Sequence, residues 1–93
     1  MEWAKLQGLM IIRKNNNWSS WEEIYSLFNY VKSELTMEPI SVRIINLTKD
    51  TMTLELFGVY RADMYDSLIS RLNEIANNLR KLYTVELTWI TGG

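Results

Sequence analysis

The sequence predicts a single α+β domain, and three observations lead to that prediction. Apolar residues fill one segment and alternate with other residues in three more, which is typical of β-strands. In two further segments they recur every three or four positions, which is typical of amphipathic helices. The chain has 93 residues, enough for one hydrophobic core but too few for two.

The first predicted strand leads through a polar turn into the first predicted helix. Residues 3–13 form an apolar run that ends at Lys14–Asn17. Ser19–Ser20 and Glu22–Glu23 then make two overlapping capping boxes, in which a hydroxyl and a carboxylate each satisfy a free amide at a helix start. Pro39 limits the length of this helix. Its predicted buried stripe is Trp21, Ile24, Tyr25, Phe28, Val31 and Leu35.

Two alternating segments predict an antiparallel hairpin in the middle of the chain. In residues 40–47, Ile40, Val42 and Ile44 share one face, and Arg43 and Ile45 share the other. A short turn at residues 48–50 leads to a strand over residues 52–57, and Gly58 ends its regular pattern.

A second helix and a fourth strand complete the predicted domain. Asp63 is the predicted N-cap, and Arg80 and Lys81 lie at the negative C-terminal end of the helix. Residues 83–90 alternate and predict the last strand. The predicted buried stripe of this helix is Leu68, Leu72, Ile75, Leu79 and Leu82. Trp21 and Trp89 are interpreted as core residues.

The order strand, helix, strand, strand, helix, strand is that of a ferredoxin-like domain. Right-handed crossovers place both helices on one face of a four-stranded antiparallel sheet, with the first and third strands in the middle. The other face stays open to solvent. By the alternation of the strands, it carries Leu9, Ile11, Arg13, Arg43, Ile45, Glu55, Phe57, Glu86 and Ile90.

The open face of the predicted sheet is the candidate functional surface. A solvated face of an antiparallel sheet is usually polar, whereas this one interleaves large apolar residues with charges. A shift of the first strand by one residue would turn Leu9 and Ile11 inward, but Met10 and Ile12 would then face solvent. The sequence therefore predicts an interface with another copy or a paralogue. Its candidate residues are Leu9, Ile11, Arg43, Ile45, Glu55, Phe57 and Ile90.

The composition argues against most kinds of active site. The sequence contains no Cys and no His, which leaves no thiol nucleophile, no imidazole base and no usual zinc ligand set. The pairs Glu22–Glu23 and Asp63–Asp66 are explained by the preference of acidic residues for helix starts. We therefore expect a chain without catalytic activity, cofactor or metal. Because no apolar stretch approaches the length of a membrane span, we also expect a cytoplasmic protein that does not bind membranes.

Nucleic-acid binding is not favoured by the charges or by the sheet. Lys plus Arg number 10 and Asp plus Glu 11, so the chain has no general attraction for phosphate. The basic, Gly-rich motif of RNA-recognition sheets is missing; Phe57 is the one well-placed aromatic, and Glu55 and Glu86 lie near it. A weaker candidate surface is formed by Arg71, Arg80 and Lys81 on the second helix, and we expect weak binding or none.

Part of the chain carries the residue pattern of a known family. The pattern is an alternating hairpin, Ser41–Ile44 with Met52–Leu56, then an acidic residue, Asp63, then a helix with Ser67–Leu68 and Leu72–Asn73. In this respect the segment from Ile40 to Leu82 resembles the small ferredoxin-related subunit of the KEOPS complex. That cancer/testis-antigen-like family helps to make threonylcarbamoyladenosine in tRNA. Family members usually carry an arginine soon after the helix leucine, where this chain has Ile69 and Ser70.

The resemblance implies a non-catalytic subunit that pairs with a copy or paralogue of itself. It also implies that the helices dock on a larger, catalytic, ATP-dependent subunit. Two alternatives stay open: a small-molecule-binding regulatory domain of the same fold, and an orphan viral or archaeal protein-binding domain. Ligand-binding domains of this fold usually have a glycine in the loop after the first strand, whereas this loop is Lys14–Asn17.

Overall fold

The computed structural model describes the backbone of residues 2–91 and the side chains of residues 2–89. Its elements follow the predicted order. They are β1 (Trp3–Arg13), α1 (Trp21–Glu34), β2 (Ile40–Leu47), β3 (Thr51–Arg61), the 3₁₀ turn η1 (Ala62–Met64), α2 (Tyr65–Leu79) and β4 (Thr84–Thr91). Within the described part of the chain, neither helix combines the length and the apolar character that crossing a bilayer requires.

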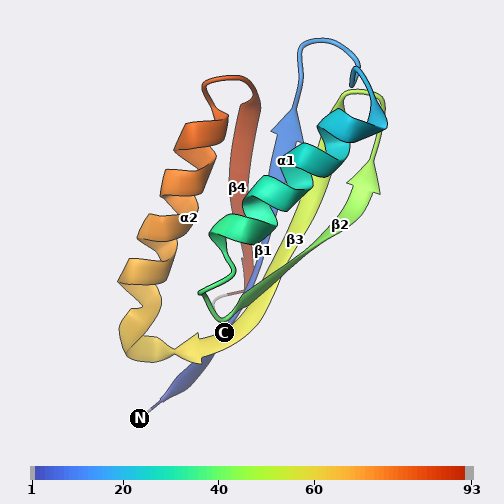
Figure 1. Ribbon diagram of the computed structural model, residues 1–93. Coiled ribbons are helices and arrows are strands. Elements are labelled where there is room, and N and C mark those ends of the chain that lie inside the picture. Colours follow the sequence, from blue (N-terminus) through green and yellow to red (C-terminus); the bar gives the residue numbers. More distant parts are fainter. Residues whose placement is uncertain (1, 92–93) are drawn as a thin grey trace.

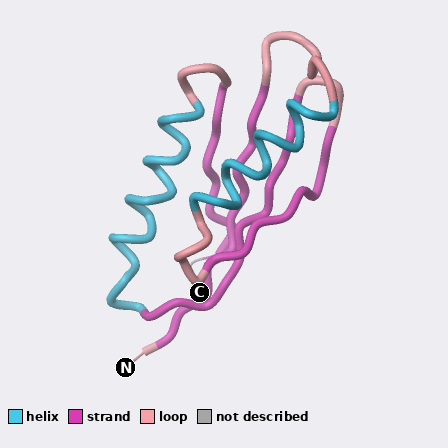
Figure 2. The backbone as a smooth tube through the Cα atoms, in the orientation of Figure 1, coloured by secondary structure: helices cyan, strands magenta, loops and turns pink. Residues whose placement is uncertain are grey.

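The strands form one antiparallel sheet in the order β2-β3-β1-β4. β1 and β3 are therefore central, as predicted, and β2 and β4 are the edges. Figure 1 shows both helices on the same side of this sheet. In Figure 2 the backbone passes from the end of β3 through the short turn η1 into α2, which then runs back along the sheet. The ferredoxin-like prediction is confirmed, and no helix formed by residues 2–91 lies on the second face of the sheet.

The pairing of β1 with β3 fixes which side chains face the helices. Their register runs without a break from Trp3 opposite Arg61 to Arg13 opposite Thr51. Met10 and Ile12 on β1 are fully buried beneath the helices. The one-residue shift of the first strand is therefore excluded, and Leu9 and Ile11 lie on the open side.

The core fills the space between the sheet and the two helices. In the described part, all buried side chains are apolar except that of Tyr60, which carries a hydroxyl and is 5% exposed. The largest fully buried side chains are Met10, Ile12, Val31, Met52, Leu54, Leu56, Leu72 and Ile75. Burial of this apolar surface, at about 25 cal/mol per Å², is the main stabilising term of the fold.

The buried face of α1 differs in part from the predicted stripe. Ile24, Leu27 and Val31 are buried, whereas Trp21 and Tyr25 are 66% and 60% exposed. Trp21 is the first residue of the helix and packs against Tyr25 one turn later, on the outer side, with ring centroids 6.4 Å apart. The assignment of both residues to the core was therefore wrong.

Three predictions for the second half of the chain were also wrong. Asp63 does not cap α2: it lies in η1, paired with Arg61, and the N-cap is Met64 without a side-chain hydrogen bond. Leu82 is 81% exposed because α2 ends at Leu79 and the chain turns there. Trp89, on the edge strand β4, is 37% exposed, with its ring against Gly8 of β1.

Gly58 does not end β3, which continues to Arg61. Gly58 pairs with Leu6 on one side and Ile40 on the other, and a Cβ atom here would overlap the carbonyl oxygen of Pro39. Glycine is thus required by the close approach of the chain at the start of β2.

We expect Gly58→Ala to lower the free energy of unfolding by about 1–3 kcal/mol, because the backbone of Pro39 must move to admit the methyl group. Urea denaturation followed by circular dichroism measures this loss. The control is Ser33→Ala at an exposed position of α1, where a change within about 0.5 kcal/mol is expected. Equal stabilities of Gly58→Ala and the wild type would contradict this account of the glycine.

Candidate interface on the open face of the sheet

The open face brings six of the seven predicted interface residues together. Leu9 of β1 lies opposite Glu55 of β3, which lies opposite Arg43 of β2, so these three form one row across the sheet. Phe57 lies two residues along β3 from Glu55, on the same face. The other two residues, Ile11 and Ile45, lie on the other side of this row from Phe57. The side chain of the seventh, Ile90, lies outside the described residues.

The apolar part of this face is larger than the sequence predicted. Phe57, Ile45 and Val59 are 36%, 49% and 51% exposed, and Leu9 and Ile11 are half-buried between their neighbours. We call these five residues the apolar strip. Val59 was missed because the third strand was predicted to end at Gly58. Following the alternation from Phe57 past the glycine would have found it.

Charged groups beside the apolar strip neutralise one another. The Arg43 guanidinium is 2.6 Å from Oε1 of Glu55 and 5.1 Å from the centroid of the Phe57 ring. Gln7 Nε2 donates to the other oxygen of Glu55 at 3.5 Å. The Glu55 side chain is only 13% exposed, whereas that of Arg43 is 64% exposed. The arginine therefore lies over the carboxylate and the ring, and Glu55 presents little free negative charge to a partner.

A bulge displaces Ile45 from the regular pairing of the edge strand. Ile44 lies opposite Leu54 and Asn46 opposite Thr53, which leaves Ile45 without a partner on β3. Bulges on edge strands disfavour pairing of that edge with another sheet. The face of the sheet is thus a better site of contact than this edge.

The candidate nucleic-acid residues are not gathered into one surface. Arg71 pairs with Glu34 at 3.2 Å and with Glu74 at 3.0 Å. Arg80 donates to the carbonyl oxygen of Val85 at 3.0 Å and follows Arg71 by nine positions, about two and a half helical turns. The two arginines thus lie on opposite sides of α2 and are held by contacts within the fold. Lys81 is exposed beyond the end of the helix.

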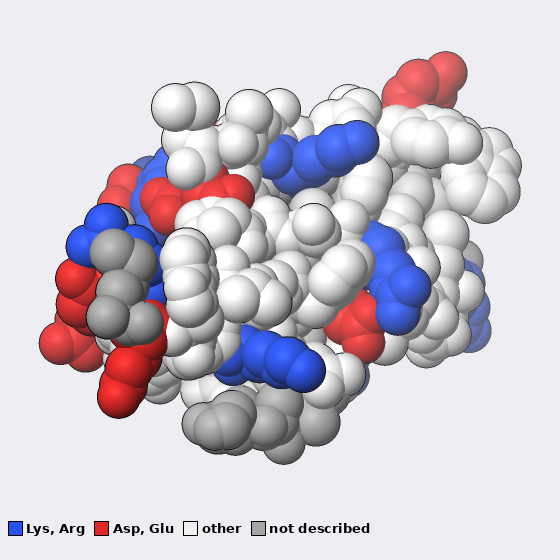
Figure 3. All heavy atoms as spheres, turned by 90° about the horizontal axis from the view of Figure 1, so that it is seen from below, with Lys and Arg blue, Asp and Glu red and all other residues white. Residues whose placement is uncertain are grey.

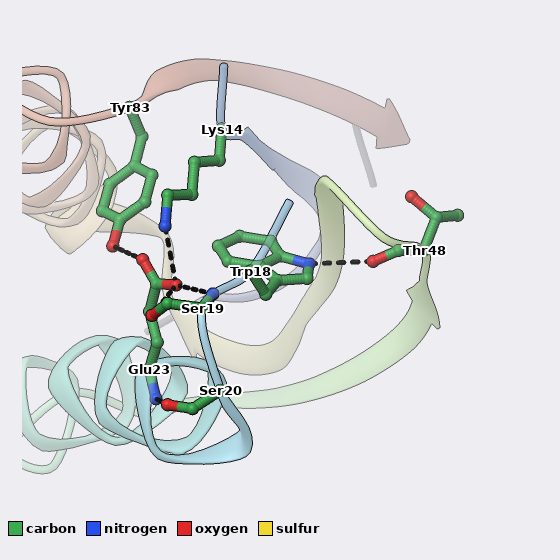
Figure 4. A network of polar contacts seen from close by, with 7 residues as sticks. All are labelled: Lys14, Trp18, Ser19, Ser20, Glu23, Thr48 and Tyr83. Atoms are coloured by element: carbon green, nitrogen blue, oxygen red, sulfur yellow. Dashed lines mark hydrogen bonds and ion pairs between the residues drawn. The ribbon is translucent and has the colours of Figure 1, made fainter. Parts of the chain in front are cut away.

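A second polar cluster lies at the other end of the sheet from Gly58, around Glu23 (Figure 4). Glu23 Oε1 accepts from Lys14 Nζ at 2.8 Å and from the Ser19 backbone amide at 2.7 Å, and Oε2 accepts from the Tyr83 hydroxyl at 3.2 Å. Ser20 Oγ accepts from the Glu23 amide at 3.3 Å, so the predicted capping hydroxyl is confirmed, but the carboxylate binds Ser19 instead of Ser20.

The electrostatics of this cluster favour a structural role. The Lys14 ammonium and the Ser19 amide lower the pKa of Glu23 from an ordinary value of 4.5 to about 2. Burial and the Glu23 carboxylate raise the pKa of Tyr83, so its hydroxyl stays protonated as a donor. Glu23 is therefore held ionised at neutral pH and joins the end of β1, the start of α1 and the start of β4.

Comparisons with known proteins identify the fold but no family. No protein-family model matches the chain, and no curated protein matches it. Solved structures do match. Aspartokinase III from E. coli, in complex with lysine and aspartate, aligns with a TM-score of 0.59 and 21% identity over 94% of this chain. The fold is ferredoxin-like. The aligned part is 18% of the aspartokinase, so this chain spans less than a fifth of that enzyme.

Two further structures share the ferredoxin-like fold over nearly their whole length. The de novo designed protein Foldit4 has a TM-score of 0.61 and 12% identity, covering 99% of this chain and 100% of its own. A variant of SnoaB, a cofactor-independent oxygenase from Streptomyces nogalater, has a TM-score of 0.57 and 14% identity, covering 95% of this chain and 92% of its own. An aspartokinase and an oxygenase share this fold, so the fold does not assign a function.

One member of each acidic pair singled out in the sequence is engaged by another residue. Asp63 accepts two hydrogen bonds from Arg61, at 3.1 and 2.7 Å, and Glu23 belongs to the cluster with Lys14. Among the residues that the structure describes, no three acidic side chains come close enough to hold a metal ion. What the open face offers chemically is apolar contact area around one internal ion pair, Arg43 with Glu55, which suits binding of another protein surface.

Proposed function

We propose that this chain is a non-catalytic interaction domain whose open sheet face packs against the same face of a second copy. The observation that carries this proposal is the apolar strip, which lies on a sheet face that no helix covers. Leaving such a surface in water is costly at about 25 cal/mol per Å². Large apolar patches rimmed by polar residues mark interaction sites on soluble proteins.

Charge and size both suit a second copy as the partner. Because Arg43 and Glu55 form an internal pair, the centre of the face needs no partner of opposite charge. Four strands about 4.8 Å apart and about eight residues long cover roughly 500 Å² in projection. The accessible area of a corrugated face is larger than its projection, so the face approaches the ~800 Å² per partner of a standard interface. A two-fold axis would bring the strip of one copy onto that of the other.

Isotope-filtered nuclear Overhauser spectroscopy on a mixture of labelled and unlabelled chains tests where two copies meet. We expect contacts between copies at the Phe57 ring and the methyl groups of Ile45 and Val59. Contacts between copies confined to α1 and α2 would show that the open face is not the interface.

A second candidate function is that of a small-molecule-binding regulatory domain. It is favoured by the similarity to part of the aspartokinase, whose structure was determined in complex with lysine and aspartate. The loop Lys14–Asn17 lacks the glycine usual in ligand-binding domains of this fold. A ligand for this chain would therefore have to bind elsewhere on the molecule.

Membership of a KEOPS-like complex remains a hypothesis supported by the sequence resemblance. The two matching hairpin segments do pair, with Val42 opposite Leu56 and Ile44 opposite Leu54. The outer side of α1 exposes Trp21 and Tyr25, which gives a helix-docked subunit an aromatic contact. Co-purification with the catalytic subunit, and its loss on changing Trp21 to Ala, is the result that this hypothesis requires.

We expect the isolated protein to bind tRNA only weakly, with a Kd of about 10⁻⁴ M or weaker at physiological salt. Arg71 and Arg80 are held by contacts within the fold, which leaves Lys81 as the free cation of the candidate surface. Fluorescence anisotropy with labelled tRNA over a salt series measures the affinity, with Lys81→Ala as the variant. Tight binding that survives raised salt, or that is lost with Phe57→Ala but not with Lys81→Ala, would contradict this expectation.

A further inference from the structure

An apolar hollow lies at the end of the molecule opposite the Glu23 cluster. It has a volume of about 290 Å³ and is formed where β1 begins, β3 ends and α2 begins. Figure 3 shows this end from below, as mostly uncharged surface between separate charged side chains. Its apolar walls are Trp3, Pro39, Tyr60, Met64 and Leu68. We call this hollow the end pocket; its size is near the lower limit of about 300–1,000 Å³ for small-molecule sites.

The walls of the end pocket include large apolar groups that are not covered by the rest of the chain. Trp3 is 63% exposed and Met64 44% exposed, whereas Leu68 is buried at 2%. The pocket thus has a closed, aliphatic base and an accessible rim with an indole ring. Flat apolar molecules suit such a site best, because one molecule can contact the aliphatic base and the indole ring at the same time.

The Tyr60 side chain supplies a polar group without a partner. Among the described residues, the Tyr60 hydroxyl forms no hydrogen bond, whereas those of Tyr30 and Tyr83 bind Asn78 and Glu23. Tyr60 as a whole is 95% buried. Its hydroxyl oxygen still reaches solvent, because in the described part no side-chain oxygen is both fully buried and without a hydrogen-bond partner. Burial and the nearby Tyr65 raise the pKa of Tyr60, which keeps the hydroxyl protonated. It can therefore donate a hydrogen bond to a bound molecule.

The charged groups at the rim do not favour an ionic ligand. Arg61 donates two hydrogen bonds to Asp63, so its guanidinium is already engaged by a carboxylate. Glu38 also lines the pocket, and it would repel an anion. An anionic ligand would have to displace Asp63, and a cation would meet mainly apolar walls.

We propose that the end pocket binds a small, neutral aromatic molecule that carries one hydrogen-bond acceptor, with Tyr60 as the donor. This inference gives a site and a ligand class to the second candidate function, on which it rests, and it is independent of pairing through the open face. The aromatic part lies against Trp3, Met64 and Leu68, and the acceptor takes the hydrogen bond from Tyr60.

Two ligands of nearly equal shape test the proposal: 2-naphthol, which has a hydroxyl, and 2-methylnaphthalene, which has a methyl group in its place. Titration of the ¹⁵N-labelled full chain, followed by heteronuclear NMR, should move the signals of Trp3, Met64 and Leu68. Tyr60→Phe should raise the Kd of 2-naphthol about three- to tenfold and leave that of 2-methylnaphthalene unchanged. The control Tyr65→Phe, on the neighbouring 44% exposed tyrosine, should change neither.

A second variant keeps the test valid if Tyr60→Phe fails to fold. Met64→Glu places a charge at the rim and should weaken both ligands at least tenfold, whereas Leu82→Glu, an exposed site on the other side of the fold, should not. Shifts confined to other residues, or no shifts with up to 1 mM of either ligand, would overturn the proposed site. Shifts induced by lysine or aspartate at other residues, together with no shifts at the end pocket by either naphthalene, would overturn this site while supporting the regulatory function.

Discussion

Phe57→Glu combined with Ile45→Lys should weaken self-association at least 100-fold. Each change removes an apolar side chain worth about 1.5–3 kcal/mol when buried and places a charge in the interface. A two-fold interface contains every residue twice, so the loss is doubled. Because 1.4 kcal/mol corresponds to a tenfold change in Kd, a loss of 3 kcal/mol already exceeds 100-fold. The fold should survive, because both side chains are partly exposed in the single chain.

Matched changes on the helical side control for the effect of new charges. Tyr25→Glu with Leu82→Lys introduces the same two charges at positions that are 60% and 81% exposed. Analytical ultracentrifugation should show dissociation of the sheet variant and unchanged association of the helix variant, with circular dichroism confirming that both fold. The opposite pattern would place the interface on the helices.

Glu23→Gln should lower the free energy of unfolding at pH 7 by about 1–2 kcal/mol. The shift in the pKa of Glu23 from 4.5 to about 2 sets an upper limit of about 3.5 kcal/mol, at about 1.4 kcal/mol per pKa unit. The expected loss is smaller, because 18% of the side chain is exposed and water screens part of the interaction with Lys14.

The same carboxylate makes stability depend on acid pH. The pKa of Glu23 is lower in the folded chain than in the unfolded chain. The contribution of Glu23 to the free energy of unfolding is therefore complete above about pH 4.5 and is lost as the pH falls towards 2. Urea denaturation at pH 7 and at about pH 2.5 measures the free energy of unfolding of wild type and of Glu23→Gln. The two proteins should differ strongly in this free energy at pH 7 and only slightly at about pH 2.5. Glu22→Gln, the adjacent exposed carboxylate, is the control. If both variants lose the same stability, the cluster in Figure 4 is not stabilising.

The sequence predicted the order of the elements and six of the residues that the structure places on the open face. Both follow from local periodicity, because a strand that alternates, such as residues 40–44, has only one way to bury Ile40 and Ile44. The sequence left the choice between Leu9 and Met10 on β1 open, and the structure decides it by placing Met10 in one row with Leu54 and Leu87.

The errors occurred where burial or capping depends on distant parts of the chain. The orientation of α1 over the sheet buries Leu27 and exposes Trp21, and the helix period alone does not set that orientation. Gly58 was interpreted as a strand end because the approach of Pro39 that requires glycine comes from the loop before β2, which is distant in the sequence. The end pocket is formed by residues from β1, β3, α2 and the loop before β2, so no local pattern in the sequence indicates it.

Sedimentation equilibrium of the unmodified chain tests the central claim, that the open face pairs two copies, most directly. The account predicts a species of twice the 11.0 kDa chain mass at about 100 µM protein, which dissociates on dilution. A mass of 11.0 kDa at every concentration up to about 1 mM would contradict it.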